Sequence, residues 1–85
     1  MILLKNTLEN HINGNKTISK QLIKQYQNNT KTLGIDIVEC CCWFGLTETI
    51  TILKKLDVSD TNIINAFYDY QSEKLNDVKT ILFNL

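Results

Sequence analysis

The side chains best suited to chemistry are three consecutive cysteines, Cys40, Cys41 and Cys42, and the single histidine, His11. A zinc site needs about four ligands at workable spacing, and no second cysteine pair accompanies the triplet. Neighbouring cysteines form a disulfide only with strain, and thiol catalysis needs a histidine beside the nucleophile. We therefore predict no metal site, no cofactor and no catalytic residue. The cysteines are expected to be reduced and to fill space as small, buried apolar residues.

Paired acids and glycines supply no catalytic pattern either. Asp36 and Glu39, like Asp57 and Asp60, are three residues apart, a spacing that on a helix usually marks a solvated face. The three glycines stand alone in the sequence, so no glycine-rich loop for phosphate is predicted. The sequence thus indicates a protein that is not an enzyme.

Charge is sorted along the chain. Residues 1–34 carry five lysines and one acid, a net charge of +4, whereas residues 35–85 carry eight acids and four lysines, a net charge of −4. Complementary potential speeds association and selects partners, so the acidic half suggests a basic partner. All basic residues are lysines and the total charge is zero. Nucleic-acid binding is therefore not favoured, because arginine is the usual reader of base edges.

The length and composition indicate one globular domain over residues 1–85. The hydrophobic fraction is 44%, which is ordinary for a globular protein. No apolar run approaches the roughly 20 residues that a membrane-spanning helix needs. The apolar start of the chain is too short for the core of a secretory signal. We expect a cytoplasmic protein that does not enter membranes.

Hydrophobic spacing predicts an all-α fold, a small bundle of four to five helices. A first helix is expected to bury one stripe and to stop at Gly14, a residue suited to a left-handed cap. A second helix is expected to begin at Thr17 as its N-cap and to end at Leu33–Gly34. The stripes of these two helices are Leu4, Leu8 and Ile12, followed by Ile18, Leu22 and Tyr26.

Residues 35–46 are nearly all apolar and fit either a central helix or a buried strand. Trp43 and Phe44 are expected in the core, and Gly45 marks either a kink or a close approach of two backbones. Residues 47–53 alternate as a strand does, but they also fit a helix through Ile50 and Leu53. We favour the helix because no hairpin turn is visible.

A polar break at residues 57–60 precedes the last part of the chain, with Ser59 and Asp60 as cap candidates. The next helix is expected to bury the stripe Ile63, Phe67 and Tyr70. The final helix is predicted to start at Ser72 as its N-cap. Its packing stripe is Leu75, Val78, Leu82 and Leu85.

Two segments carry a resemblance to a known family. The acidic turn at residues 57–60, DVSD, and the aromatic-acidic segment at residues 68–82, YDYQSEKLNDVKTIL, resemble the colicin D immunity proteins and the related immunity proteins of contact-dependent growth-inhibition systems. The likeness spans most of the chain, including a short amphipathic opening helix, a second helix that begins at residues 17–19 and a buried middle, and is sharpest over residues 57–83. It implies a four-helix immunity protein that binds the C-terminal nuclease domain of a toxin, commonly one that cleaves transfer RNA. In that family an acidic face stands in for the phosphates of the RNA.

The residues themselves agree with such a surface. A ribonuclease presents a basic cleft, and carboxylates can occupy it through charge-assisted hydrogen bonds. Tyrosine is enriched at binding hot spots. We therefore expect a 1:1 complex with a cognate toxin nuclease domain, although each acid could instead be a cap or a solvated residue. The candidate partner-binding residues are Asp57, Asp60, Tyr68, Asp69, Tyr70, Glu73 and Asp77.

Two alternatives stay open. One is a small phage or mobile-element inhibitor of a host defence protein, which would use the same acidic mimicry on another target. The other is a helix-turn-helix regulator whose recognition helix covers residues 17–27. Its DNA contacts would come from Lys16, Lys20, Lys24 and Lys31.

Overall fold

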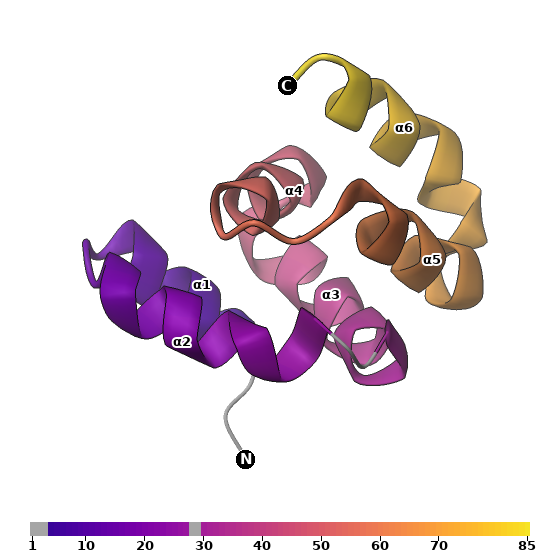
Figure 1. The fold of residues 1–85 in the computed structure, drawn as a ribbon. Helices are drawn as coiled ribbons and strands as arrows, with labels where there is room; N and C mark the ends of the chain where they lie inside the picture. Colours follow the sequence, from indigo (N-terminus) through magenta and orange to yellow (C-terminus); the bar gives the residue numbers. More distant parts are fainter. Residues whose placement is uncertain (1–3, 28–29) are drawn as a thin grey trace.

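The computed structural model describes the backbone of residues 4–27 and 30–85, and these residues form six α-helices and a short 3₁₀ turn (Figure 1). The predicted all-α class is confirmed, with no strand in the described residues. The helices number six rather than four or five. Their bounds are α1 (Leu4–Ile12), α2 (Lys16–Gln27), α3 (Thr30–Phe44), α4 (Leu46–Lys55), α5 (Asp60–Tyr70), the turn η1 (Ser72–Lys74) and α6 (Leu75–Phe83).

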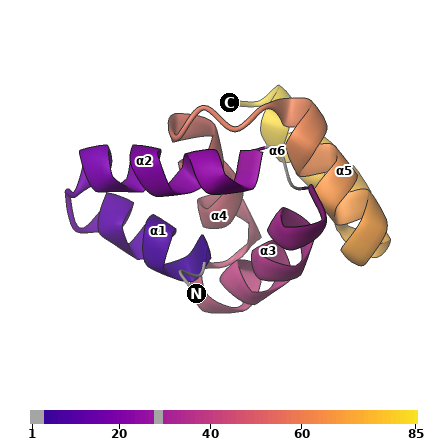
Figure 2. The same cartoon turned by 60° about the horizontal axis from the view of Figure 1, so that its bottom comes forward.

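Helix α3 is the centre of the arrangement and contacts α1, α2, α4 and α5. Helices α1 and α2 pack together on one side of it, and α5 and α6 pack together on the other (Figures 1 and 2). Helix α4 lies between the two pairs and contacts α1, α3 and α6. None of the helices in the described part of the chain is long and apolar enough to span a membrane.

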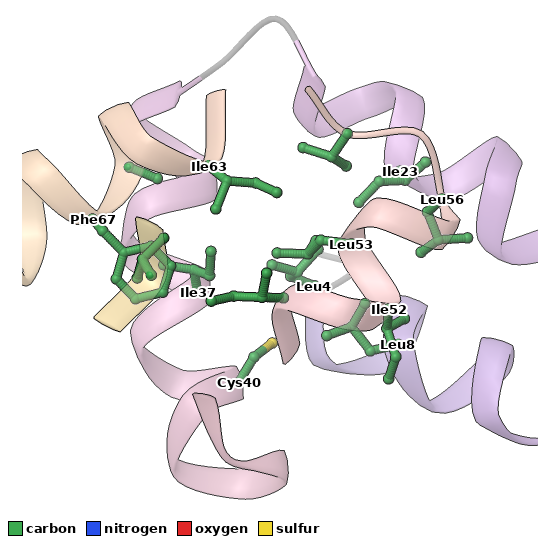
Figure 3. Packing of buried hydrophobic residues seen from close by; sticks show 14 residues of the cluster. Leu4, Leu8, Ile23, Ile37, Cys40, Ile52, Leu53, Leu56, Ile63 and Phe67 are labelled. Carbon is green, nitrogen blue, oxygen red and sulfur yellow. The ribbon is translucent and has the colours of Figure 1, made fainter. Parts of the chain in front are cut away.

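All six helices contribute buried apolar side chains to one core. Phe67 is the largest fully buried residue, and Figure 3 shows it beside Ile37 and near Ile63. Full burial of one such side chain is worth roughly 1.5–3 kcal/mol. A buried hydrogen bond adds specificity, because the Ser19 hydroxyl of α2 donates to the Thr7 carbonyl of α1 at 2.9 Å. The core therefore joins the two helix pairs through α3 and α4.

The turn between α1 and α2 agrees only in part with the prediction. Gly14 has φ 91°, the positive value expected of it. Thr17 is not the N-cap, because α2 already begins at Lys16. Ile12 is 51% exposed at the end of α1, so the predicted stripe stops at Leu8. The predicted stripe positions Ile18 and Tyr26 lie outside the described side chains.

The predicted helix end at Leu33–Gly34 was wrong, because α3 begins at Thr30 and continues through Gly34. The glycine is buried. A Cβ atom there would meet Cδ2 and Cε2 of the Tyr70 ring well inside van der Waals contact, and its Cγ at 3.3 Å. Gly34 therefore makes room for α5 to approach α3.

Residues 35–53 are helical throughout except at Gly45, which answers the helix-or-strand question for both segments. Gly45 has φ 85° and nothing lies within 4 Å of a Cβ placed on it, so it turns the chain between α3 and α4 without a close backbone contact. Trp43 is 64% exposed, and its predicted place in the core was wrong. Phe44 is half-buried and packs against the core.

Of the two serine caps predicted for the last helices, one is confirmed and one was wrong. Ser59 is the N-cap of α5, as predicted, and its side chain accepts a hydrogen bond from the Asn62 backbone N–H at 3.1 Å. Ser72 caps nothing, because it starts the 3₁₀ turn and α6 begins three residues later without a side-chain cap. Leu85 lies beyond the end of α6 and is 60% exposed, unlike the buried Val78.

Candidate functional site

The structure divides the seven predicted partner-binding residues into two groups. Asp57 and Asp60 lie at the start of α5, whereas the other five lie where α5 ends and α6 begins. Asp60 and Tyr68, the nearest members of the two groups, are eight positions apart on α5, a span of about 12 Å at 1.5 Å per residue. We call the second group the acidic corner; it consists of Tyr68, Asp69, Tyr70, Glu73 and Asp77.

The first group has roles in the fold. The Asp60 carboxylate forms an ion pair with the Lys54 ammonium at 2.5 Å. Asp60 also lies in the first turn of α5, where a negative charge is favourable. Asp57 has φ 66° in the link from α4 to α5, a conformation that aspartate tolerates better than most residues. These roles in the fold account for both acids, so binding to another protein is not needed to explain them.

A tight backbone turn builds the acidic corner. The Gln71 N–H donates to the Phe67 carbonyl at 2.8 Å and ends α5, and the Lys74 N–H donates to the Gln71 carbonyl at 3.0 Å. The chain therefore reverses within the three residues of η1 before α6 starts. Asp69 and Glu73 come to lie on either side of this turn.

The three acids of the corner are exposed and form no ion pair with any described residue. Glu73 and Asp77 are four residues apart, which places them on one side of the chain. Lys79 follows Asp77 by two residues, and about 200° of helical rotation turns it away. Asp69 lies in the last turn of α5, where a negative charge is unfavourable by about 0.3–1 kcal/mol. The fold gives no reason for an acid at that position.

The two tyrosines of the acidic corner differ in how much of the side chain is exposed to solvent. Tyr68 is 66% exposed and lies on the face of α5 away from the buried Phe67. Tyr70 is 37% exposed, and one side of its ring packs on Gly34. Tyr70 is therefore fixed in place by α3, while Tyr68 offers most of its ring to solvent.

Sequence reasoning missed the exposed outer face of α3. Ile35 is 54% exposed and Cys42 is exposed, although both belong to the apolar run. Trp43 is exposed as well, and the Lys5 ammonium lies 3.8 Å from the centre of its ring, a cation–π contact between α3 and α1. The signal that could have revealed this face is Glu39, since helical spacing places it beside Ile35 and Cys42.

The cysteines line a cavity next to the acidic corner. Its volume is about 260 Å³, and its walls are Cys41, Cys42, Leu46, Gln71 and Lys74. All three thiols are free, and no group of three or more possible metal ligands occurs in the described part of the chain. The predicted burial holds for Cys40, is partial for Cys41 and was wrong for Cys42.

Burial sets the reactivity of the two inner thiols. Burial raises the pKa of Cys40 to about 12, and the neighbouring Cys41, Asp36 and Glu39 add to this effect. Figure 3 shows its sulfur directed toward the core. Burial also raises the pKa of Cys41, while the Thr49 hydroxyl and the Lys74 ammonium act in the opposite direction. A protonated thiol is a poor nucleophile, so these two cysteines are the less reactive ones.

The basic side of the molecule lies across from the acidic corner. Lys16, Lys20 and Lys24 are spaced four residues apart along α2, and all three are exposed. The pKa of His11 is lowered by burial and then by the charges of Lys16 and Lys55. Figure 2 places α1 and α2 at one end of the molecule and α5 and α6 at the other. The charge sorting seen along the sequence is thus also a separation in space.

The chain was compared with models of protein families, with curated proteins and with solved structures. None of the three comparisons found a match. Any assignment of function therefore has to come from the residues and their arrangement.

Proposed function

We propose that this protein binds and neutralises a cognate toxin, with the acidic corner covering a basic nucleic-acid cleft on the toxin's nuclease domain. The observation that carries the proposal is the set of exposed acids at the turn between α5 and α6, which lie beside two tyrosines and form no ion pair with a described residue. Such a surface offers charge for steering and aromatic area for anchoring. The resemblance of residues 57–83 to colicin D-type immunity proteins points to the same end of the chain.

The position of Asp69 strengthens the proposal. An acid at the C-terminal end of a helix opposes the helix dipole, and no described side chain offsets its charge with an ion pair. A residue that lowers stability is retained more readily where binding needs it. Asp69 therefore has a better explanation in recognition than in folding.

The acids at the other end of α5 are expected to contribute less. Asp60 already pairs with Lys54, so a partner would have to break that ion pair before using the carboxylate. Asp60 is also about 12 Å from Tyr68, the nearest residue of the corner, by helix length. The proposed interface thus centres on five of the seven residues predicted from the sequence.

The test is co-expression with the C-terminal domain of the protein encoded beside this one, since immunity proteins are encoded next to their toxins. If the proposal holds, the neighbouring domain arrests growth alone, this protein restores growth, and the two purify as a 1:1 complex. Asp69→Lys with Glu73→Lys is expected to weaken the complex at least about 30-fold, the equivalent of 2 kcal/mol for buried charge pairs. A harmless neighbour, or arrest that this protein does not relieve, would reject the proposal.

The matched control reverses the same number of charges on the basic side. Lys20→Glu with Lys24→Glu changes two exposed residues of α2 and is expected to leave the complex intact. A specific observation, the lysine stripe of α2, favours DNA binding as the second candidate function. That function predicts the opposite pattern, in which the lysine variant loses a salt-dependent DNA complex and the corner variant keeps it.

A further inference from the structure

The cavity between α3, α4 and the end of α5 combines groups that the proposed interface does not use. Two thiols, an amide and an ammonium surround about 260 Å³ of space, with Leu46 as the apolar wall. This volume is far larger than the roughly 30 Å³ that a water molecule occupies in the liquid. The cavity therefore has room for a small organic ligand.

Lys74 is the one charged residue among those that line the cavity. The Lys74 ammonium forms no ion pair within the described residues. The positive charge of Lys74 acts on the thiols that line the cavity, because it lowers the pKa of Cys41, whereas burial raises that pKa. The cavity thus offers one cation, Lys74, and one exposed thiol, Cys42.

We propose that this cavity is a thiol-exchange site at which Cys42 takes up one half of a small anionic disulfide of the glutathione type. The Cys42 thiolate attacks one sulfur of the disulfide, a new S–S bond forms to Cys42, and the old S–S bond breaks. The departing thiolate takes up a proton, and Cys42 loses its own. Cys42 is oxidised and the released thiol is reduced, so the disulfide itself supplies the oxidant.

Residues that line the cavity match the chemical groups of such a ligand. Lys74 pairs with a carboxylate of the bound half. Cys42 is the exposed thiol of the three, whereas Cys40 is buried. Glu39 lies one turn before Cys42 on α3 but is not among the lining residues. The anionic ligand is therefore held on the side of Cys42 that faces Lys74.

The test treats the intact protein with oxidised glutathione and, separately, with the cationic disulfide cystamine, and follows both adducts by mass spectrometry with peptide mapping. We expect one glutathione adduct, on Cys42, in the parent protein and none in Cys42→Ser. Lys74→Gln is expected to lower the ratio of the glutathione rate to the cystamine rate by about threefold or more, in keeping with a partly screened charge pair. Lys79→Gln, an exposed lysine outside the cavity, is the matched control and leaves the ratio unchanged.

Three results would overturn the proposal. The first is a glutathione adduct on another cysteine, and the second is no adduct at all. The third is a rate ratio that Lys74→Gln and Lys79→Gln change equally, which would make Cys42 an ordinary exposed thiol. None of these measurements depends on a toxin partner.

Discussion

Replacing Gly34 with alanine tests the contact that fixes Tyr70. In the interior of a helix this change normally stabilises a protein by about 1 kcal/mol, because alanine loses less backbone entropy on folding. At Gly34 the added Cβ would overlap the Tyr70 ring. Overpacking of this kind costs about 1–3 kcal/mol. With a mid-range penalty of about 2 kcal/mol, Gly34→Ala is expected to destabilise the protein by about 1 kcal/mol.

The sign of the effect should reverse when the ring is removed. A Tyr70→Ala background removes the three atoms nearest to the new Cβ, so Gly34→Ala is expected to stabilise by about 1 kcal/mol there. The coupling energy between the two positions is then about 2 kcal/mol, within the range for residues in direct contact. Tyr68→Ala is the matched control: it removes an exposed tyrosine from the same helix, so Gly34→Ala should still destabilise in that background.

Urea unfolding followed by far-UV circular dichroism gives the free energy of unfolding of the parent protein, the three single variants and the two double variants. Thermal unfolding of the same six proteins is a second readout, because a change of 1 kcal/mol in a domain of this size shifts the melting temperature by about 4–8 °C. The reasoning would be refuted if Gly34→Ala stabilised the parent protein. It would equally be refuted if the effect were the same with and without the Tyr70 ring.

Three further predictions concern stability. Ser59→Ala removes the hydrogen bond to the Asn62 N–H and should lower the free energy of unfolding by about 1 kcal/mol in urea titrations, whereas Ser72→Ala, which caps nothing, should change it little. Phe67→Ala should cost about 3–5 kcal/mol, and a native-like melting temperature for this variant would contradict the core described above. The pKa of Cys40 in the folded protein is about 12, against an ordinary value of 9.0. Its contribution to the free energy of unfolding is therefore complete below pH 9 and is lost as the pH rises toward 12, so that this free energy falls by up to about 1.4 kcal/mol per pH unit. When unfolding is measured between pH 8 and about 11, Cys40→Ala should show a clearly smaller slope, because only the raised pKa of Cys41 still contributes, and Cys42→Ala should retain the slope of the parent protein.

Amphipathic spacing predicted those parts of the fold where polar residues interrupt the apolar ones. Leu4 and Leu8, like Ile63 and Phe67, recur at helical intervals and are fully buried. Ser59 was found as a cap because its hydrogen bond is local. These signals act within one or two turns of helix, so the sequence carries them without knowledge of the fold.

The failures arose where a distant part of the chain decides. Gly34 resembles a helix end when only its neighbours are considered, but the Tyr70 ring is the reason for a glycine there. Trp43 was expected in the core because a long apolar run gives little indication of its outer face. The candidate site shows the same limit, since sequence reasoning selected the acids but could not place Asp57 and Asp60 at the far end of α5 from Glu73.

The separation of charge between α2 and the acidic corner has a consequence for the behaviour of the pure protein. Lys16, Lys20 and Lys24 are exposed at one end, and Asp69, Glu73 and Asp77 are exposed at the other, while the net charge is zero. Copies of the chain therefore attract one another when the basic end of one meets the acidic end of the next, and no overall repulsion opposes the approach. Dissolved salt shortens the reach of this attraction to about 10 Å at 0.1 M. The protein should consequently salt in, being least soluble near neutral pH in dilute buffer and more soluble as salt is added.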